Sequence, residues 1–242
     1  MTQFPSESVE YRQARDRLLQ QEIELRRITE SVAAARRGLP SGGAVPDDYL
    51  FEGAGPDGFP VPVRLSDLFE EGKDTLFTYN MMFPRAPDED LPCPSCTQFL
   101  DSFDGVVEHA SQRINVVIVV KTPIAQALDH THTRGWRHLR FVSSANNTFN
   151  RDYHGEDPND GQQQPMLNVF ARNGDIIRHV WGSEMLFEQN GQAFSDDVGQ
   201  KDHCTTPPKT VTKIVTKRCP NMPICNQNRS QCRCKLLIPG RV

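Results

Sequence analysis

The first 40 residues carry apolar side chains at a helical spacing. These positions recur every seven residues, at Tyr11, Leu18, Leu25 and Val32, with Ala14 and Ile28 on the same side. The pattern predicts one amphipathic helix over residues 8–37, with Ser8 as its N-cap and Gly38 at its end. We expect this helix to pack on the rest of the chain through its apolar side. A coiled coil requires sustained heptads, and Gln21 interrupts this short series.

Beyond this helix, short β-branched and aromatic runs alternate with helical patterns. Residues 39–62 hold many prolines and glycines and predict a loop with one short strand near 48–51. Further strands are predicted at 75–83, 114–120, 139–142, 166–171 and 175–181, and helices at 97–112 and from Pro123 onward. Asn173-Gly174 predicts a hairpin turn between the last two strands. The alternation indicates an α/β domain whose largely parallel sheet is covered by helices.

The charge distribution divides the chain near residue 203. The 242 residues carry a net charge of −4, but residues 204–242 hold eight basic side chains, no acidic side chain and five of the seven cysteines. The first 203 residues hold 19 basic and 31 acidic side chains, a net charge of −12. Such a shift in composition marks a boundary. We therefore predict an N-terminal helix and linker at 1–45, a domain at 46–203, and a disordered basic tail at 204–242.

The sequence shows no signal for a membrane or for secretion. Its longest unbroken apolar run, residues 116–120, is far too short to cross a bilayer, and the first 30 residues lack an apolar stretch. We expect a cytoplasmic protein that keeps its thiols reduced, so the odd number of cysteines does not indicate a disulfide framework.

Two cysteines stand where redox chemistry is expected. Cys93-Pro94-Ser95-Cys96 follows a predicted strand and opens a predicted helix, which is the setting of a thioredoxin-like Cys-x-x-Cys motif. The free N–H groups and dipole of a helix start favour a thiolate there, and Pro94 costs no hydrogen bond at the first turn. We expect Cys93 to be the exposed nucleophile and Cys96 the resolving thiol.

Several segments together resemble one known family. They are Cys93-Pro-Ser-Cys96, Arg134-Gly-Trp136, the block from Ser143 to Gly155, Pro165-Met-Leu-Asn-Val-Phe170 and Trp181-Gly-Ser-Glu184. Over residues 9–200 the chain is similar to the thioredoxin-like family catalogued as domain of unknown function 899. The resemblance implies a thioredoxin-like fold, a central mixed sheet flanked by helices, and it implies no particular reaction. The apolar ending usual in the family is replaced here by the basic tail.

A thioredoxin-like fold places a cis proline just before the strand that faces the Cys-x-x-Cys pair. Pro165 stands at that position, and we expect its peptide bond to be cis; the alternative is a trans proline ending a loop.

Polar residues follow the predicted strand that ends at residue 142. Asn150, Arg151 and Asp152 belong to this block and either line a pocket beside Cys93, with Trp136, or form a hydrogen-bonded loop. Arg151 would favour the thiolate if it pointed inward. The histidines near Trp136 do not have the convergent spacing of metal ligands, and we predict no metal site there.

The cysteines of the tail do not fit a zinc site. Cys219, Cys225, Cys232 and Cys234 lack the paired spacing of zinc knuckles and ribbons. The tail also lacks aromatic residues on which bases could stack, so we predict no nucleic-acid partner. Such a tail arises from a shifted reading frame or from a lineage-specific extension, and one sequence does not separate the two.

Two classes of function follow from these features. In the first, the protein is a thiol–disulfide oxidoreductase or a peroxiredoxin-like protein in which Cys93 attacks a disulfide or peroxide and Cys96 resolves the intermediate. Its partners would be that substrate and a reducing protein, without a cofactor, a metal or a membrane. In the second, it is a non-catalytic thioredoxin-fold scaffold with redox-silent cysteines. The oligomeric state does not follow from the sequence.

Overall fold

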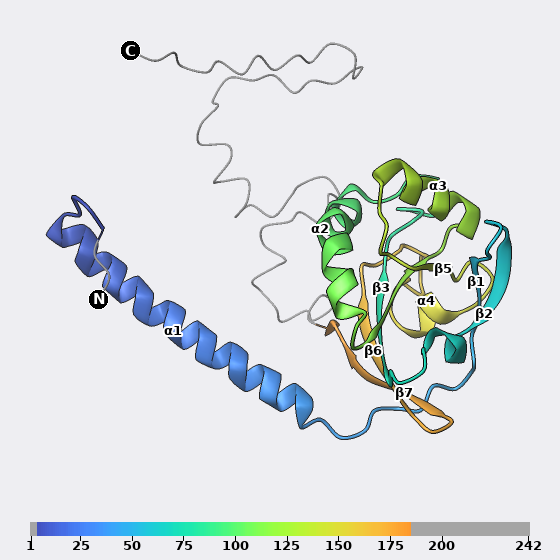
Figure 1. The fold of residues 1–242 in the computed structure, drawn as a ribbon, viewed down its shortest axis with the longest axis horizontal. Coiled ribbons are helices and arrows are strands. Elements are labelled where there is room, and N and C mark those ends of the chain that lie inside the picture. The colour runs from blue at the N-terminus through green and yellow to red at the C-terminus, as the bar shows by residue number, and fades with distance from the viewer. Residues whose placement is uncertain (1–3, 185–242) are drawn as a thin grey trace, which may run out of the picture. The chain divides into compact units, whose positions relative to one another are not determined.

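The computed structural model describes residues 4–184, and Figure 1 shows their helices and strands. The elements in chain order are α1 (Val9–Arg37), β1 (Leu50–Ala54), β2 (Pro60–Arg64), the short 3₁₀ helix η1 (Leu65–Leu68), β3 (Thr75–Asn80), α2 (Pro94–Ala110), β4 (Asn115–Val120), α3 (Ile124–Arg134), β5 (Phe141–Ser143), α4 (Phe149–Asp152), β6 (Leu167–Asn173) and β7 (Ile176–Gly182). The predicted tail lies outside the described residues.

The long N-terminal helix forms where the heptad spacing predicts it. Ser8 caps α1, and its Oγ accepts a hydrogen bond from the Tyr11 N–H at 3.1 Å. Gly38 closes the C-terminal end through hydrogen bonds to the carbonyl groups of the last turn. However, α1 contains no buried residue. The predicted burial of its apolar side on the domain is therefore not found among the described residues.

Seven strands form one mixed sheet in the order β2-β1-β5-β4-β3-β6-β7. The central strands β3, β4 and β5 run parallel, and β1, β2, β6 and β7 pair in antiparallel fashion. The strand before the Cys-x-x-Cys motif, β3, thus lies between a parallel neighbour and an antiparallel hairpin. The alternation of elements predicts a largely parallel sheet, and that prediction is wrong, because two strand pairings are parallel and four are antiparallel. The mixed sheet is instead the thioredoxin-like arrangement that the family resemblance implies.

The sheet separates two apolar layers. Alternate residues of β4 point to opposite faces, because side chains alternate along a strand: Ile118 joins one cluster and Val117 the other. Residues of α2 and α3 cover the first face together with both cysteines of the motif, and η1 and α4 cover the second. The Cys-x-x-Cys pair is therefore built into the layer between the sheet and α2.

Local signals predicted most of these elements, and β2 is the main exception. Asn173 and Gly174 form the predicted hairpin turn, with Gly174 at φ +60°. The prolines and glycines of residues 39–62 predict a loop that includes the first part of residues 60–64. Residues 60–64 instead form β2, which lies at one edge of the sheet, where a missing backbone N–H is tolerated.

Candidate functional site

The Cys-x-x-Cys pair lies at the start of α2, as predicted. Cys93 is the N-cap of the helix in extended conformation, and Pro94 occupies the first turn. The Cys93 N–H donates to the Met82 carbonyl at 2.9 Å, which ties the helix start to the segment after β3. Ser95 is half-buried and Pro94 is exposed, so the turn between the cysteines lies at the surface.

Both sulfur atoms are enclosed, which corrects the expectation of an exposed nucleophile. Cys93 is 0 % exposed and Cys96 2 %, and both are free thiols. They belong to the apolar cluster between the sheet and the helices, whose other members include Met82, Phe83 and Trp136. The local sequence predicts where the helix starts. The exposure of the Cys93 thiol depends instead on residues far along the chain that pack over this helix start. A reagent therefore reaches Cys93 only when this packing opens.

The two thiols interact with each other. The Cys96 side chain is hydrogen-bonded to Cys93, and this contact, followed by burial and the charge of Cys93, raises the pKa of Cys96 above its ordinary range. Hydrogen bonds from the Tyr79 hydroxyl and the Met82 backbone act in the opposite direction and are weaker. A raised pKa disfavours the thiolate form of Cys96.

An aromatic and histidine cluster surrounds the first turn of α2. The His130 ring packs edge-on against Phe83 and Trp136, at centroid distances of 5.7 and 5.3 Å. Its Nε2 lies 3.4 Å from Thr97 Oγ1, and the Thr97 hydroxyl donates to the Cys93 carbonyl at 3.0 Å. Burial, and then the charge of Arg134, lowers the pKa of His130. A neutral imidazole is therefore part of the cluster that holds the motif.

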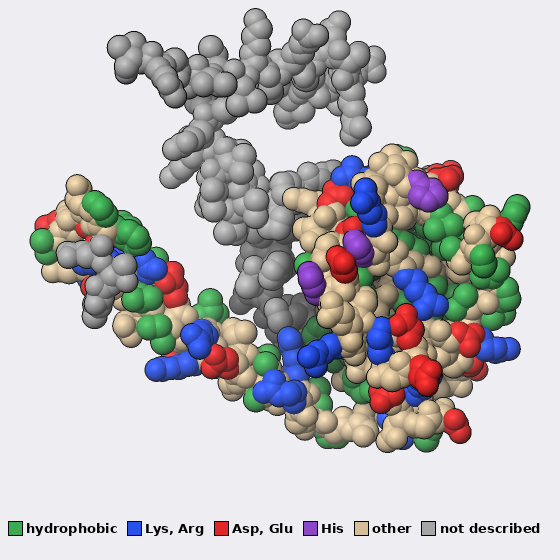
Figure 2. Space-filling model, viewed as in Figure 1, with side chains coloured by type: hydrophobic (Ala, Val, Ile, Leu, Met, Phe, Trp, Pro, Cys, Tyr) green, Lys and Arg blue, Asp and Glu red, His purple; other side chains and the backbone are tan. Residues whose placement is uncertain are grey.

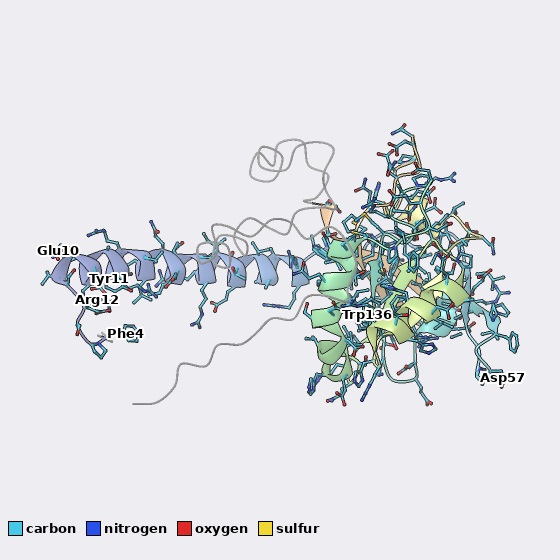
Figure 3. The ribbon with its side chains drawn as sticks, turned by 90° about the horizontal axis from the view of Figure 1, so that it is seen from above. Phe4, Glu10, Tyr11, Arg12, Asp57 and Trp136 are labelled. Carbon is cyan, nitrogen blue, oxygen red and sulfur yellow. The ribbon has the colours of Figure 1, made fainter. Side chains whose placement is uncertain are left out.

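Trp136 connects this cluster to the helices (Figure 3). Its indole N–H donates to Asp101 Oδ1 at 3.0 Å, and its ring stacks on Phe141. Asp101 also pairs with Arg134. Burial raises the pKa of Asp101, but the hydrogen bonds from Arg134 and Trp136 outweigh it, and the pKa is lowered. Of the predicted site-lining residues outside the motif, Trp136 is the one that shares an apolar cluster with the two thiols.

Asn150 is part of a hydrogen-bonded loop, which is one of the two alternatives that the sequence leaves open. Its Oδ1 accepts from Asn80 Nδ2 at 2.9 Å and from Ser144 Oγ at 2.7 Å, and its Nδ2 donates to Gln163 Oε1 at 2.9 Å. All four side chains are buried. The role of Asn150 is thus to fix this loop to the end of β3.

Arg151 and Asp152 make their polar contacts with residues outside the apolar cluster of the thiols. The Arg151 side chain is 56 % exposed, and its nearest acidic partner is Glu156 at 3.9 Å. Asp152 accepts hydrogen bonds from the Thr148 and Tyr49 hydroxyl groups.

The peptide bond before Pro165 is trans, so the prediction of a cis bond there is wrong. The cis bond of the described residues joins Phe83 to Pro84 instead. Pro165 still precedes β6, and the carbonyl of the next residue, Met166, accepts a hydrogen bond from the Asn80 N–H at 2.8 Å. The segment is thus held at the end of β3 by backbone pairing.

Within residues 4–184, no three His, Cys, Asp or Glu side chains converge as a metal site would require. The same residues contain no helix that is both long and apolar enough to span a bilayer. Sequence reasoning did not identify Tyr79 or Asn80 as site residues. Both residues lie at the end of β3, the strand that leads into the motif. Polar side chains at the end of a buried strand are the sequence signal that indicates them.

Comparison with models of protein families identifies the family to which the chain belongs. A model of the family described as "Bacterial protein of unknown function (DUF899)" matches residues 1–195. The matched segment ends before Cys204, where the basic tail begins. No curated protein shows significant sequence similarity to the chain.

Solved structures give distant similarities. One is the exposed lipoprotein thioredoxin Etrx1 of Streptococcus pneumoniae, at 18 % identity over 55 % of this chain and 87 % of that chain, with a TM-score of 0.37. A second is AhpC of Enterococcus faecalis, at 15 % identity over 74 % and 92 %, with a TM-score of 0.42. A third is the mitochondrial 2-Cys peroxiredoxin of Plasmodium falciparum, at 14 % identity over 57 % and 78 %, with a TM-score of 0.38. These values are too low to bear on activity.

Proposed function

The chain belongs to the bacterial family DUF899, and we propose that it is a cytoplasmic thiol–disulfide oxidoreductase that uses Cys93 and Cys96. The observation that supports this most is the position of two free thiols one turn apart at the start of α2, with Cys93 at the N-cap and Cys96 in the first turn. Since the pKa of Cys96 is raised, we assign the role of nucleophile to Cys93. The dipole of α2 favours a negative charge at its N-cap, which is Cys93.

The proposed reaction is an exchange of two electrons. The Cys93 thiolate attacks one sulfur of a substrate disulfide and expels the other as a thiolate, which takes up a proton. Cys96 then loses its proton and attacks Cys93 Sγ, which releases the substrate as a dithiol and leaves a Cys93–Cys96 disulfide. A reducing dithiol protein returns the pair to two thiols. With a peroxide as the oxidant, the Cys93 thiolate would attack one peroxide oxygen, the O–O bond would break, and the other oxygen would leave as an alcohol or water after taking up a proton. Cys96 would then attack the resulting sulfenic acid, displace water and form the Cys93–Cys96 disulfide.

The complete burial of both sulfurs favours a second candidate, a non-catalytic scaffold. A thiol inside an apolar cluster is inert unless the packing opens. In that case the cysteines stabilise the fold as small apolar residues.

One experiment separates the two candidates. Peptide mapping after mild oxidation should detect a Cys93–Cys96 disulfide, and alkylation of Cys93 should rise with pH at a midpoint below the value of about 8.5 for a free thiol. A matched pair of variants tests the hydrogen bond: Cys96→Ser keeps an O–H donor, and Cys96→Ala removes it. The midpoint should be higher in Cys96→Ala. If no disulfide forms and both thiols react only after unfolding, the scaffold is the correct reading.

A further inference from the structure

The apolar side of α1 is exposed along its whole length. Its members are Tyr11, Leu18, Leu25, Ile28 and Val32, with exposed fractions of 45–65 %. We call this set the α1 seam. Figure 2 shows green apolar side chains among charged ones along this helix. A stable 29-residue helix without any buried side chain has unsatisfied apolar surface, which favours association with another surface.

The α1 seam follows a heptad register that continues through four repeats. Position a holds Tyr11, Leu18, Leu25 and Val32, and position d holds Ala14, Gln21, Ile28 and Ala35. Three of the four residues at d are apolar. Gln21 interrupts the apolar series at one d position, and the register continues on both sides of it. A single polar residue in such a seam lowers stability, but it favours the register in which it meets its own copy.

The charges beside the α1 seam distinguish between arrangements of two helices. In a parallel, in-register pair, each g residue faces the e residue five positions later in the other helix. Glu10 then faces Arg15 of the second copy, and Arg17 faces Glu22. The later g positions, Glu24 and Ser31, face Thr29 and Arg36, so no like charges meet. Glu10 and Tyr11 lie in the first turn of α1 (Figure 3).

An antiparallel pair is less favourable. If the two helices overlapped over all a and d positions, from Tyr11 to Ala35, the centre of the antiparallel pair would lie near residue 23. Glu22 would then face its own copy across the e side, and Glu24 would do the same across the g side. Like charges at these positions oppose association.

From this pattern we propose that α1 is a dimerisation element that binds α1 of a second copy of this chain as a parallel coiled coil. In the single copy Arg15 pairs with Glu22 of its own helix at 2.9 Å. Both residues lie at e positions, and each gains a partner of opposite charge from the second helix. The inference is independent of the chemistry proposed for the cysteines.

The test compares substitutions on the two sides of α1 in the full-length chain. Analytical ultracentrifugation over a wide concentration range should show a monomer–dimer equilibrium. Leu25→Glu should weaken the dimer at least about a hundredfold, because a seam residue becomes charged. Ile23→Glu is the matched control, since Ile23 is an exposed apolar residue of the same helix at the outer f position. It should leave the equilibrium unchanged, with circular dichroism showing intact helix in both variants.

Charge exchange tests the parallel orientation. Arg17→Glu should weaken the dimer by about tenfold, and adding Glu22→Arg should restore it, because the cross-helix pair is rebuilt with reversed signs. The proposal is overturned if the chain stays monomeric, if Leu25→Glu leaves the dimer intact, or if Ile23→Glu disrupts it equally. Failure of the double variant to recover would rule out the parallel pair.

Discussion

The side-chain amide of Asn80, at the end of β3, donates to the side-chain oxygen of Asn150, 70 residues further along the chain. The next residues after Asn80 lead into Met82, whose carbonyl receives the Cys93 N–H. One hydrogen bond thus links the polar loop around Asn150 to the strand that leads into the Cys-x-x-Cys motif. This loop therefore supports the end of β3.

The first prediction follows from that link. Asn150→Ala should lower the free energy of unfolding by about 3 kcal/mol or more, because it removes the hydrogen bonds that Asn150 makes with the buried Asn80 Nδ2 and Gln163 Oε1 atoms. Asn146→Ala is the control: it removes an exposed hydrogen bond to Glu52 and should cost less than about 1 kcal/mol. Urea unfolding measures both, and equal losses would contradict the role of Asn150.

A pair of glycines tests the packing around Asn80. A Cβ at Gly155 would collide with the Asn80 side-chain amide, whereas a Cβ at Gly105 in α2 would meet nothing. Gly155→Ala should therefore cost about 1–3 kcal/mol of stability through overpacking. Gly105→Ala should add about 0.5–1 kcal/mol, because alanine is the better helix residue. Thermal melts of the two variants should shift in opposite directions.

The parts predicted from the sequence are those that local chemistry determines. The hairpin at Asn173 and Gly174 and the helix start at Pro94 depend on residues within a few positions. The exposure of Cys93, the partner of Asn150 and the isomer at Pro165 depend on segments far apart in the chain, and no local pattern encodes them. The sequence therefore did not show that Asn150 forms a hydrogen bond with Asn80, because the two residues meet only in the folded chain.

The depressed pKa of His130 predicts a pH dependence of stability. Burial, and then the charge of Arg134, disfavours the imidazolium form in the fold, so the unfolded chain binds the proton more readily. Stability from this group is fully present above the unfolded pKa of about 6.5 and is lost as the pH falls through the lower folded value. His179, which is also lowered by burial, adds to the same trend.

His130→Gln should accordingly reduce the loss of stability between neutral and mildly acidic pH, even if it lowers stability at pH 8. The exposed His132 of the same helix supplies the control, His132→Gln, which should keep the wild-type pH dependence. Urea midpoints at a series of pH values measure this. An unchanged pH profile in His130→Gln would show that the histidine stays accessible to protons in the fold.

The burial of Cys93 makes its reactivity a measure of how the site opens. If the protein is an oxidoreductase, a local movement around the start of α2 must expose the sulfur while the rest of the domain stays folded. Leu68 provides a remote test, because it is fully buried in the cluster on the opposite face of the sheet. Leu68→Ala should cost about 2–5 kcal/mol of global stability.

With local opening, alkylation of Cys93 in native buffer should proceed at nearly the same rate in Leu68→Ala as in the wild type. With access only through global unfolding, the rate should rise at least about thirtyfold, in proportion to the unfolded population. Mass spectrometry of the Cys93 peptide at several times gives the rate. An increase of that size would mean that the thiols are structural, and the scaffold would replace the redox enzyme.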